Sequence, residues 1–318
     1  MQADGKLINK LKFDKVQGLG PLVGLVLIVV SLSVVNGDFL TASNFLNVLR
    51  QISINALIAF GMTFVILTGG IDLSVGSILA LSGALAGGLM AGGMNTWLAV
   101  IIGLIAGMLM GMVNGLLITK GKVAPFIATL ATMTVFRGLT LVYTQGKPIT
   151  GFKDDFAFVG KGYFLQIPMP IIWMVVAFAV LYIILKHTTF GRRVYALGSN
   201  EEATWLSGIN TSKVKILVYS ISGLLAATSG MILSSRLNSA QPTAGGAFEL
   251  DAIAAVVLGG TSLSGGKGWI VGTLIGAMII GVLDNGLNLL NVSSFYQQVV
   301  KGIVILIAVL LDRSKSRK

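Results

Sequence analysis

Few residues in this chain have the types and spacing that catalysis or metal binding requires. The sequence contains no cysteine, so it has neither a thiol nucleophile nor a thiolate metal ligand, and His187 is its one histidine. It also has no carboxylate pair within its apolar runs, and no serine–histidine pair or His-Glu-x-x-His string. The sequence therefore argues against an enzyme, a bound cofactor and a resident metal.

One glycine-rich string imitates a phosphate-binding loop. The string Gly260-Thr-Ser-Leu-Ser-Gly265 has the required spacing, but Gly266 stands where a lysine must follow, and Lys267 is followed by glycine. A phosphate loop also needs a strand before it, and no strand pattern precedes this one. We therefore predict that the chain itself binds no nucleotide.

The most informative polar stretch is Lys186–Lys215, about thirty residues that separate two apolar runs. Ser199 and Glu202 have the spacing of a capping box, in which the serine caps a backbone N–H and the glutamate reaches back to the serine N–H. Gly208 is a plausible left-handed helix stop. These signals predict a short helix from Asn200 to Ser207. A helix this short is marginal in water, so it needs something to pack against, and otherwise the stretch is a solvated connector.

Composition determines the class of protein that surrounds this stretch. The 318 residues are 54% hydrophobic and only 11% charged, with a mean hydropathy of +0.88. This predicts an all-α polytopic membrane protein with a single membrane domain over 1–318. About ten spans are expected, of which the second, sixth and eighth are short enough to be broken helices. The expected spans are Leu19–Val35, Ile54–Thr68, Val75–Met94, Trp97–Thr119, Phe126–Tyr143, Ile171–Leu185, Val214–Leu233, Ala252–Leu263, Trp269–Leu290 and Val299–Leu311.

The net charge of +11 fits a membrane protein better than a nucleic-acid-binding one. If the N-terminus is cytoplasmic, sixteen lysines and arginines fall inside and five outside. We therefore expect three cytoplasmic segments: residues 1–18, the loop 186–215 and the tail 312–318. Arg137 and Lys301 fall within spans, near the outer end, where they could snorkel to the interface.

Glycine and alanine recur every four residues in several spans, which predicts close helix packing in lipid. These rows are Ala80, Ala84, Gly88 and Gly92; Gly107, Gly111 and Gly115; and Gly272 and Gly276. Two glycine-rich interruptions, 69–76 and 259–266, match at five of eight positions at an offset of 190. An internal repeat is one interpretation, and the chance similarity of glycine-rich strings is the other. Asp72, in the first interruption, is interpreted as an interfacial cap of the third span, with a buried paired carboxylate as the alternative.

Four strings together resemble the permease subunits of bacterial ABC importers for monosaccharides. They are GMTFVILTGGIDLSVGSILAL (61–81), APFIATLATMTVFRGLTLVYT (124–144), YALGSNEEATWLSGIN (195–210) and SAQPTAGGAFELDAIAAVVLGGTSLSGGKG (239–268). The resemblance covers nearly the whole chain and favours ribose among the sugars of that family. It implies a type II-like importer permease fold in the bacterial cytoplasmic membrane and three kinds of partner. These are a second permease subunit, a cytoplasmic ABC ATPase and an extracytoplasmic sugar-binding protein.

In such permeases a cytoplasmic Glu-Ala-Ala…Gly motif docks on the ATPase, and the sequence here has threonine at 204 in place of the second alanine. The resemblance assigns the coupling role to Glu201, Glu202, Ala203, Gly208 and Ile209. Arg50 and Arg236 are expected outside, either to dock the binding protein or to anchor the interface. Candidates for the translocation path are polar side chains in the spans, each of which could equally bond another helix. They are Gln51, Asn55, Asn114, Asn285 and Asn288.

Two other classes of transporter stay open at this point. An ion-coupled secondary transporter needs an ionisable site within its spans, and the candidate carboxylates are Asp72, Glu249, Asp251 and Asp284, all expected near the interface. A passive solute channel is the other alternative. The sequence does not decide among ribose, xylose, arabinose, galactose and autoinducer sugars, or between a homodimer and a heterodimer.

Overall fold

The computed structural model describes residues 19–316, so the expected cytoplasmic segment 1–18 and residues 317–318 lie outside it. Within this range the chain forms thirteen helices, of which ten match the ten expected spans in order. The ten are α2 (Leu19–Val35), α3 (Ala42–Leu67), α4 (Val75–Ala91), α5 (Thr96–Thr119), α6 (Pro125–Thr144), α8 (Met169–His187), α11 (Thr211–Leu237), α12 (Phe248–Leu258), α13 (Ile270–Leu289) and α14 (Ser294–Ser316). The all-α polytopic prediction is thus confirmed.

Two of the three spans that were expected to be short are longer than expected. The second span was expected to be short, but α3 has 26 residues because helix continues through the polar stretch before Ile54. The sixth, α8, has 19 residues and is long enough to cross a bilayer. The eighth, α12, has only 11 residues, as its short apolar run indicated. The expected tail from 312 continues α14 as helix up to Ser316.

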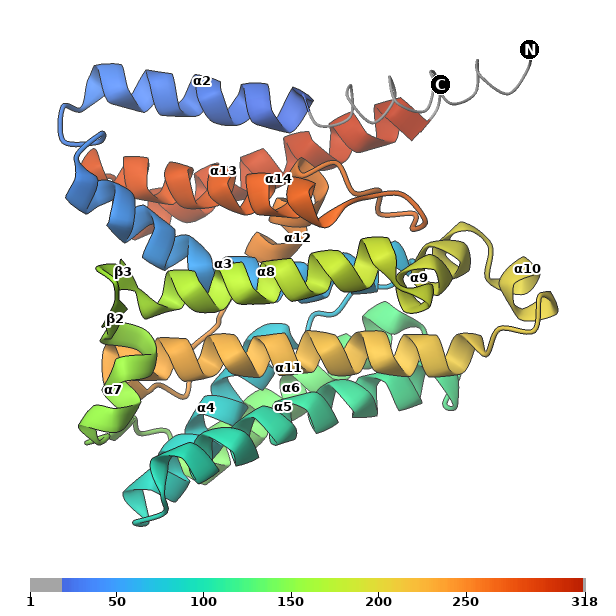
Figure 1. Cartoon of the computed structure of the whole chain (residues 1–318), viewed down its shortest axis with the longest axis horizontal. Helices are drawn as coiled ribbons and strands as arrows, with labels where there is room; N and C mark the ends of the chain where they lie inside the picture. Colours follow the sequence, from blue (N-terminus) through green and yellow to red (C-terminus); the bar gives the residue numbers. More distant parts are fainter. Residues whose placement is uncertain (1–18, 317–318) are drawn as a thin grey trace.

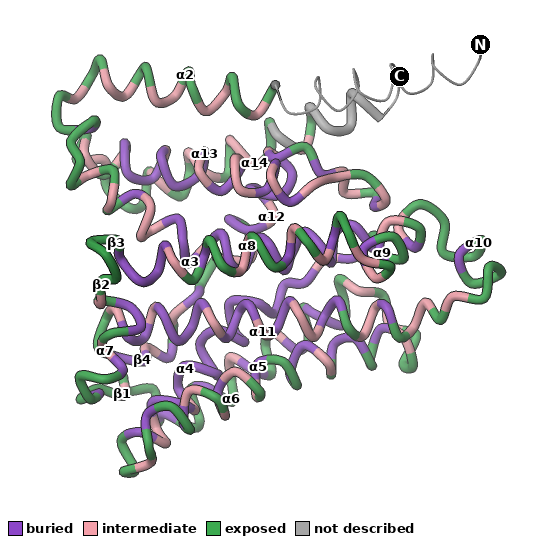
Figure 2. The backbone as a smooth tube through the Cα atoms, viewed as in Figure 1, coloured by how far each residue is buried: buried purple, intermediate pink, exposed green. Residues whose placement is uncertain are grey.

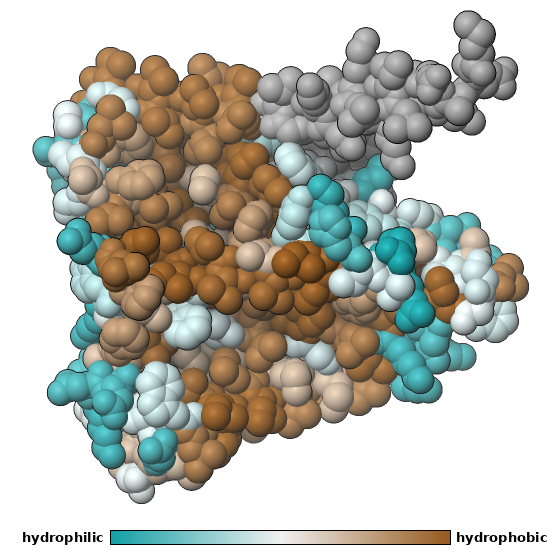
Figure 3. Space-filling view, viewed as in Figure 1, coloured by the Kyte–Doolittle hydropathy of each residue, from teal (hydrophilic) through white to brown (hydrophobic). Residues whose placement is uncertain are grey.

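The remaining helices lie at the two ends of the bundle (Figure 1). Helix α7 (Asp154–Lys161) and two small antiparallel strand pairs lie at one end, and α9 (Thr189–Ser199) and α10 (Glu201–Leu206) lie at the other. One pair joins β1 (Ile149–Thr150) to β4 (Ser239–Ala240), and the other joins β2 (Tyr163–Phe164) to β3 (Ile167–Pro168). Figure 3 shows a broad apolar band between these polar ends, as a bilayer-spanning bundle requires.

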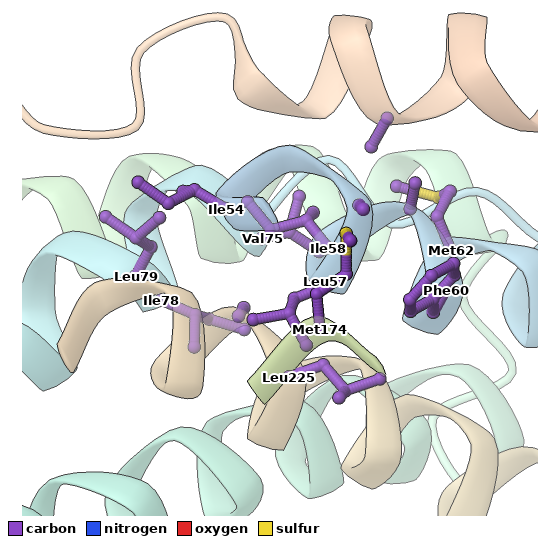
Figure 4. Close-up of a cluster of buried hydrophobic side chains, with 14 of the residues drawn as sticks. Ile54, Leu57, Ile58, Phe60, Met62, Val75, Ile78, Leu79, Met174 and Leu225 are labelled. Carbon is purple, nitrogen blue, oxygen red and sulfur yellow. The ribbon is translucent and has the colours of Figure 1, made fainter. Parts of the chain in front are cut away.

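Helix α3 lies at the centre of the bundle and is buried along most of its length (Figure 2). Its apolar side chains pack against α8 and α11, as Figure 4 shows for Leu57, Met174 and Leu225, and the helix also contacts α12 and α13. Because lipid is as apolar as these side chains, close packing between helices holds the bundle together.

Glycines provide that close packing, as the repeated small residues predicted. No Cβ fits at Gly107, Gly111 or Gly115 of α5, because α11 lies directly against each of them. A Cβ at Gly272 or Gly276 of α13 would likewise clash with the backbone of α12 or its C-cap, Gly259. Gly92 is an exception, since only carbonyls of its own α4 lie near it.

The two glycine-rich interruptions form the same kind of helix end. After α3, Gly69 has φ +78° and its N–H donates to Ile66 O at 2.9 Å. After α12, Gly260 has φ +87° and its N–H donates to Val257 O, also at 2.9 Å. Both are left-handed stops of the Schellman type. The equivalent glycines are one residue further apart than the sequence offset of 190 placed them.

Candidate functional site: the α9–α10 region

The polar segment 186–215 folds into two short helices where one was expected. Helix α9 begins after Thr188, whose hydroxyl accepts the Gly191 N–H at 3.2 Å. Its inner face buries Gly191, Val194 and Leu197, which recur every three residues. This spacing is typical of one face of a helix, but the stretch was predicted to be a polar loop because basic residues lie between the apolar ones.

Asn200, and not Ser199, caps the second helix. The Asn200 side chain accepts the Ala203 N–H at 2.9 Å. Ser199 is still the last residue of α9, and its hydroxyl donates to Tyr195 O. The predicted capping box of Ser199 and Glu202 is therefore wrong, because the unexpected helix α9 occupies the first of its two positions.

The predicted end of α10 is confirmed. Gly208 has φ +80°, and its N–H donates to Trp205 O at 2.9 Å. The Ile209 N–H follows with a bond to Thr204 O, which completes the left-handed stop. The chain then turns directly into α11, where Asn210 caps the Lys213 N–H at 2.9 Å.

Helix α10 presents apolar side chains to solvent. Trp205 is 63% exposed and Leu206 71% exposed, whereas Thr204 faces inward. Beside them lies a pocket of about 330 Å³ whose lining includes Trp205, Gly208 and Ile209. A salt bridge of 2.7 Å between Glu201 and Lys215 joins α10 to the base of α11. An exposed tryptophan next to a pocket is typical of a protein contact surface.

Helix α9 connects this surface to both helix interruptions. The Tyr195 hydroxyl donates to Gly268 O at 2.8 Å, and Gly198 packs so closely on Leu67 O that no Cβ fits. The two interruptions are themselves bonded, since the Gly266 N–H donates to Leu67 O at 3.0 Å. Burial raises the pKa of Tyr195 to about 12, so its hydroxyl stays a neutral donor at physiological pH. Tyr195 and Gly198 thus bring α9 into contact with the interruption after α12 and with the end of α3.

The predicted path residues mostly bond neighbouring helices. Asn114 is fully buried, donates to Ser74 Oγ at 2.7 Å and accepts from Thr132 Oγ1 at 2.6 Å. Asn285 exchanges two hydrogen bonds with Asn44, at 2.8 and 3.0 Å.

The other three predicted path residues are less enclosed. Asn288 is exposed and accepts from Gln297 at 2.8 Å, whereas Gln51 and Asn55 are half-buried. A role for any of the five path residues in translocation stays a prediction.

Four charged groups that were expected near the interface lie inside the protein: Lys301, Asp251, Asp284 and Asp72. Lys301 was expected to snorkel, but it bonds Asp251 at 3.0 Å and Asp284 at 2.9 Å, and thus joins α14 to α12 and α13. Both aspartates are buried, and Asn55 lies 3.5 Å from Asp251.

Asp72 is fully buried as well, which corrects its interfacial placement. It accepts hydrogen bonds from Ser222 Oγ at 2.9 Å and from Ser74 Oγ at 2.6 Å. It also accepts the Ser74 N–H at 3.0 Å, just before α4 begins, so part of the cap interpretation holds. These hydroxyls and the N–H replace the water that the carboxylate loses on burial.

Arg50 and Arg236, which were expected on the outer face, are both half-buried and lie close enough for their charges to repel. Arg50 donates to the Tyr163 hydroxyl, and its guanidinium lies 5.1 Å from the centre of the Tyr163 ring. Among the described side chains, which are those of residues 19–307, 309 and 310, no three come together as a metal site would require.

Comparison with known proteins identifies the family. Residues 44–309 match the family model described as branched-chain amino acid transport system / permease component. The chain belongs to this family of membrane permeases. It is 66% identical to the ribose import permease protein RbsC of Bacillus subtilis over 97% of each chain. The corresponding protein of Haemophilus influenzae is 56% identical over 91% of each.

A more distant relative is named for the transport of a different sugar. The D-allose transport system permease protein of Escherichia coli is 40% identical, over 88% of this chain and 86% of its own. No solved structure matches this chain. Family membership makes the chain a multi-pass membrane transport subunit.

Proposed function

We propose that this chain is the membrane-spanning permease subunit of an ATP-driven importer for ribose. The observation that carries the proposal is its 54–66% identity, over more than nine-tenths of its length, to ribose import permease proteins of three bacterial species. The D-allose relative is markedly more distant at 40% identity, which favours ribose over a hexose.

The ATPase of this importer is a separate cytoplasmic chain, and α10 is its docking site. Trp205 and Leu206 supply an apolar contact, and the adjoining pocket adds the polar residues Asn210, Thr211 and Ser212. This end of the bundle also carries Arg192, Arg193 and Lys213. Glu201, Glu202, Ala203, Gly208 and Ile209 form or terminate that helix. ATP-driven movement of α10 passes through α9 to the two interruptions, and the bundle opens alternately to either side.

Orientation follows from the same asymmetry. The α9–α10 end carries Arg192, Arg193 and Lys213, which favours the cytoplasmic side of the inner membrane. Both termini then lie on that side. A second copy of this chain completes the pore, since one permease chain with one docking helix matches one half of a paired ATPase.

A sugar-binding protein docks on the opposite face, near Arg50 and Arg236. The two cations lie close together at the outer ends of α3 and α11, where they suit carboxylates of a partner. Reversing both charges should abolish ribose uptake and leave copurification of the ATPase intact. Uptake that continues at the wild-type rate removes this docking role.

The test of the whole proposal is reconstitution of the permease, its ATPase and a ribose-binding protein in liposomes. We expect ribose uptake that requires all three proteins and ATP. The cluster of Lys301, Asp251 and Asp284 favours one competing function, ion-coupled transport, since such transporters need ionisable groups within their spans. Ribose uptake by the permease alone, driven by a proton or sodium gradient, would establish that alternative and refute ours.

A further inference from the structure

The segment between α11 and α12 runs deep into the membrane. It starts next to β4, which pairs with β1 at the outer end of the bundle. At its other end, Gly245 packs so tightly against Gly76 that neither has space for a Cβ. Gly76 is the second residue of α4, and the rest of that helix, at 1.5 Å per residue, extends about 22 Å further towards the outer face. Residues 241–247 are therefore non-helical backbone at membrane depth.

Arg137 of α6 holds this segment in place. Its Nη1 donates to Pro242 O at 2.8 Å and to Ala244 O at 2.7 Å. The expectation that Arg137 snorkels to the interface is therefore wrong. A guanidinium has five N–H donors, and no acceptor for Nη2 or Nε lies among the atoms that the structure describes. Arg137 is only half-buried, so these donors are available to another molecule.

A carboxylate lies near the arginine without pairing with it. Glu249, in the first turn of α12, is close enough for its charge to attract Arg137. Arg137 and Glu249 form no direct salt bridge. The acidic residues in the ion pairs of the described residues are Glu201, Asp251 and Asp284. A cation and an anion thus share one region of the membrane interior, each with hydrogen-bonding capacity left over.

The surface around them is exposed and polar. Thr134 and Gly138 lie beside Arg137 on one stripe of α6, and Thr243, Gly246 and Ala247 are the exposed residues of the segment 241–247. We call the six residues Thr134, Arg137, Gly138, Thr243, Gly246 and Glu249 the mid-membrane polar surface. Lipid satisfies neither irregular backbone nor charged side chains, so such a surface at this depth must line water or protein.

We propose that the mid-membrane polar surface lines the aqueous translocation path and hydrogen-bonds the hydroxyls of the passing sugar. This inference rests on the proposed transport of a neutral monosaccharide. Each sugar hydroxyl both donates and accepts, so arginine N–H groups and a glutamate carboxylate together suit a pair of neighbouring hydroxyls. One positive and one negative charge leave the surface without net charge, which suits a neutral solute.

The absence of cysteine makes the path directly testable by thiol labelling. Single cysteines at 134 and 243 (T134C and T243C) report the proposed path. V135C and L139C are matched controls, because Val135 and Leu139 are also exposed on α6 but on its apolar side. Each variant is reconstituted with ATPase and binding protein and treated with a charged, membrane-impermeant methanethiosulfonate reagent.

We expect T134C and T243C to react at least tenfold faster than V135C and L139C, and ribose uptake to stop once they are modified. Equal, slow reaction at all four positions would overturn the inference, because the surface would then face lipid. Fast reaction in the isolated permease that disappears in the assembled complex would also overturn it, because the surface would then be a contact between subunits.

A charge-neutral variant tests the contact with sugar. Glu249→Gln keeps the shape of the side chain and should slow ribose uptake severalfold while ATPase copurification and the labelling pattern stay unchanged. An unchanged uptake rate in E249Q would remove the sugar contact from the inference. The labelling experiment does not depend on which sugar is carried, so failure of wild-type ribose uptake with the expected labelling would count against the proposed substrate alone.

Discussion

Two short helices at opposite ends of the bundle differ in how far the rest of the chain buries them (Figure 1). Helix α7, at one end, buries Phe156 and Val159 and donates its Gly160 N–H to Ser235 Oγ of α11 at 2.8 Å. Helix α10, at the other end, buries only Thr204 and leaves Trp205 and Leu206 exposed. Neither helix is long enough to be stable by itself. The chain covers α7 with its own residues, whereas it leaves the apolar side chains of α10 uncovered, as the proposed docking of an ATPase there requires.

The largest effect should come from removing the contact that docks α7. Phe156 is 1% exposed and packs edge-on against Phe152, with 5.2 Å between the two ring centroids. Phe156→Ala should lower the free energy of unfolding by about 3–5 kcal/mol, because the cavity cannot close fully. Thermal unfolding in detergent measures it. Phe158→Ala is the matched control in the same helix, since Phe158 is 46% exposed and should change stability little. Similar losses in both would mean that α7 is not docked as described.

The stop of α10 should be sensitive for a different reason. Gly208→Val places a β-branched residue at φ +80°, which costs about 1–2 kcal/mol locally. We expect weaker ATPase copurification and a loss of sugar-stimulated ATP hydrolysis, with the transmembrane bundle intact. Gly146→Val is the control, because Gly146 has φ +70° and open surroundings but lies at the end of the bundle opposite α10. If the two variants behave alike in ATPase binding, the geometry of α10 has no role in coupling.

The smallest effect is expected at the salt bridge that joins α10 to α11. Glu201 is 52% exposed and Lys215 18% exposed, so water weakens their attraction. Glu201→Gln should change permease stability by less than about 1 kcal/mol. Its effect on ATP-coupled uptake should be modest and should shrink as salt is added. Glu202→Gln, in the same turn, is the control. A strong, salt-independent loss in E201Q alone would assign Glu201 a direct contact with the partner.

Local sequence signals predicted what local forces determine. Hydropathy located all ten spans, and the short apolar run at 252–263 correctly indicated the half-length α12. Repeated glycines predicted the α5–α11 contact, and Gly208 predicted where α10 ends.

What local spacing could not reveal are pairings between distant residues. Arg137 bonds carbonyls more than a hundred positions away, and Lys301 bonds a carboxylate fifty positions away. Such contacts replace snorkelling and interfacial placement, because a charge inside the membrane is stable once a partner satisfies it. The predicted cap of α10 was wrong for a related reason, since only the tertiary packing of α9 shows that Ser199 belongs to the preceding helix.

The most direct test of the account compares two pairs of neighbouring residues in one binding measurement. Trp205→Ala/Leu206→Ala removes the exposed face of α10, and Phe164→Ala/Leu165→Ala removes a similarly exposed aromatic–leucine pair at the outer end. The Kd for the ATPase is measured with each permease in lipid nanodiscs. We predict that the first variant binds roughly a hundredfold more weakly, about 3 kcal/mol, with unchanged thermal stability, and that the second binds like the wild type. Equal affinity for all three would contradict the account, because α10 would then be only a connector.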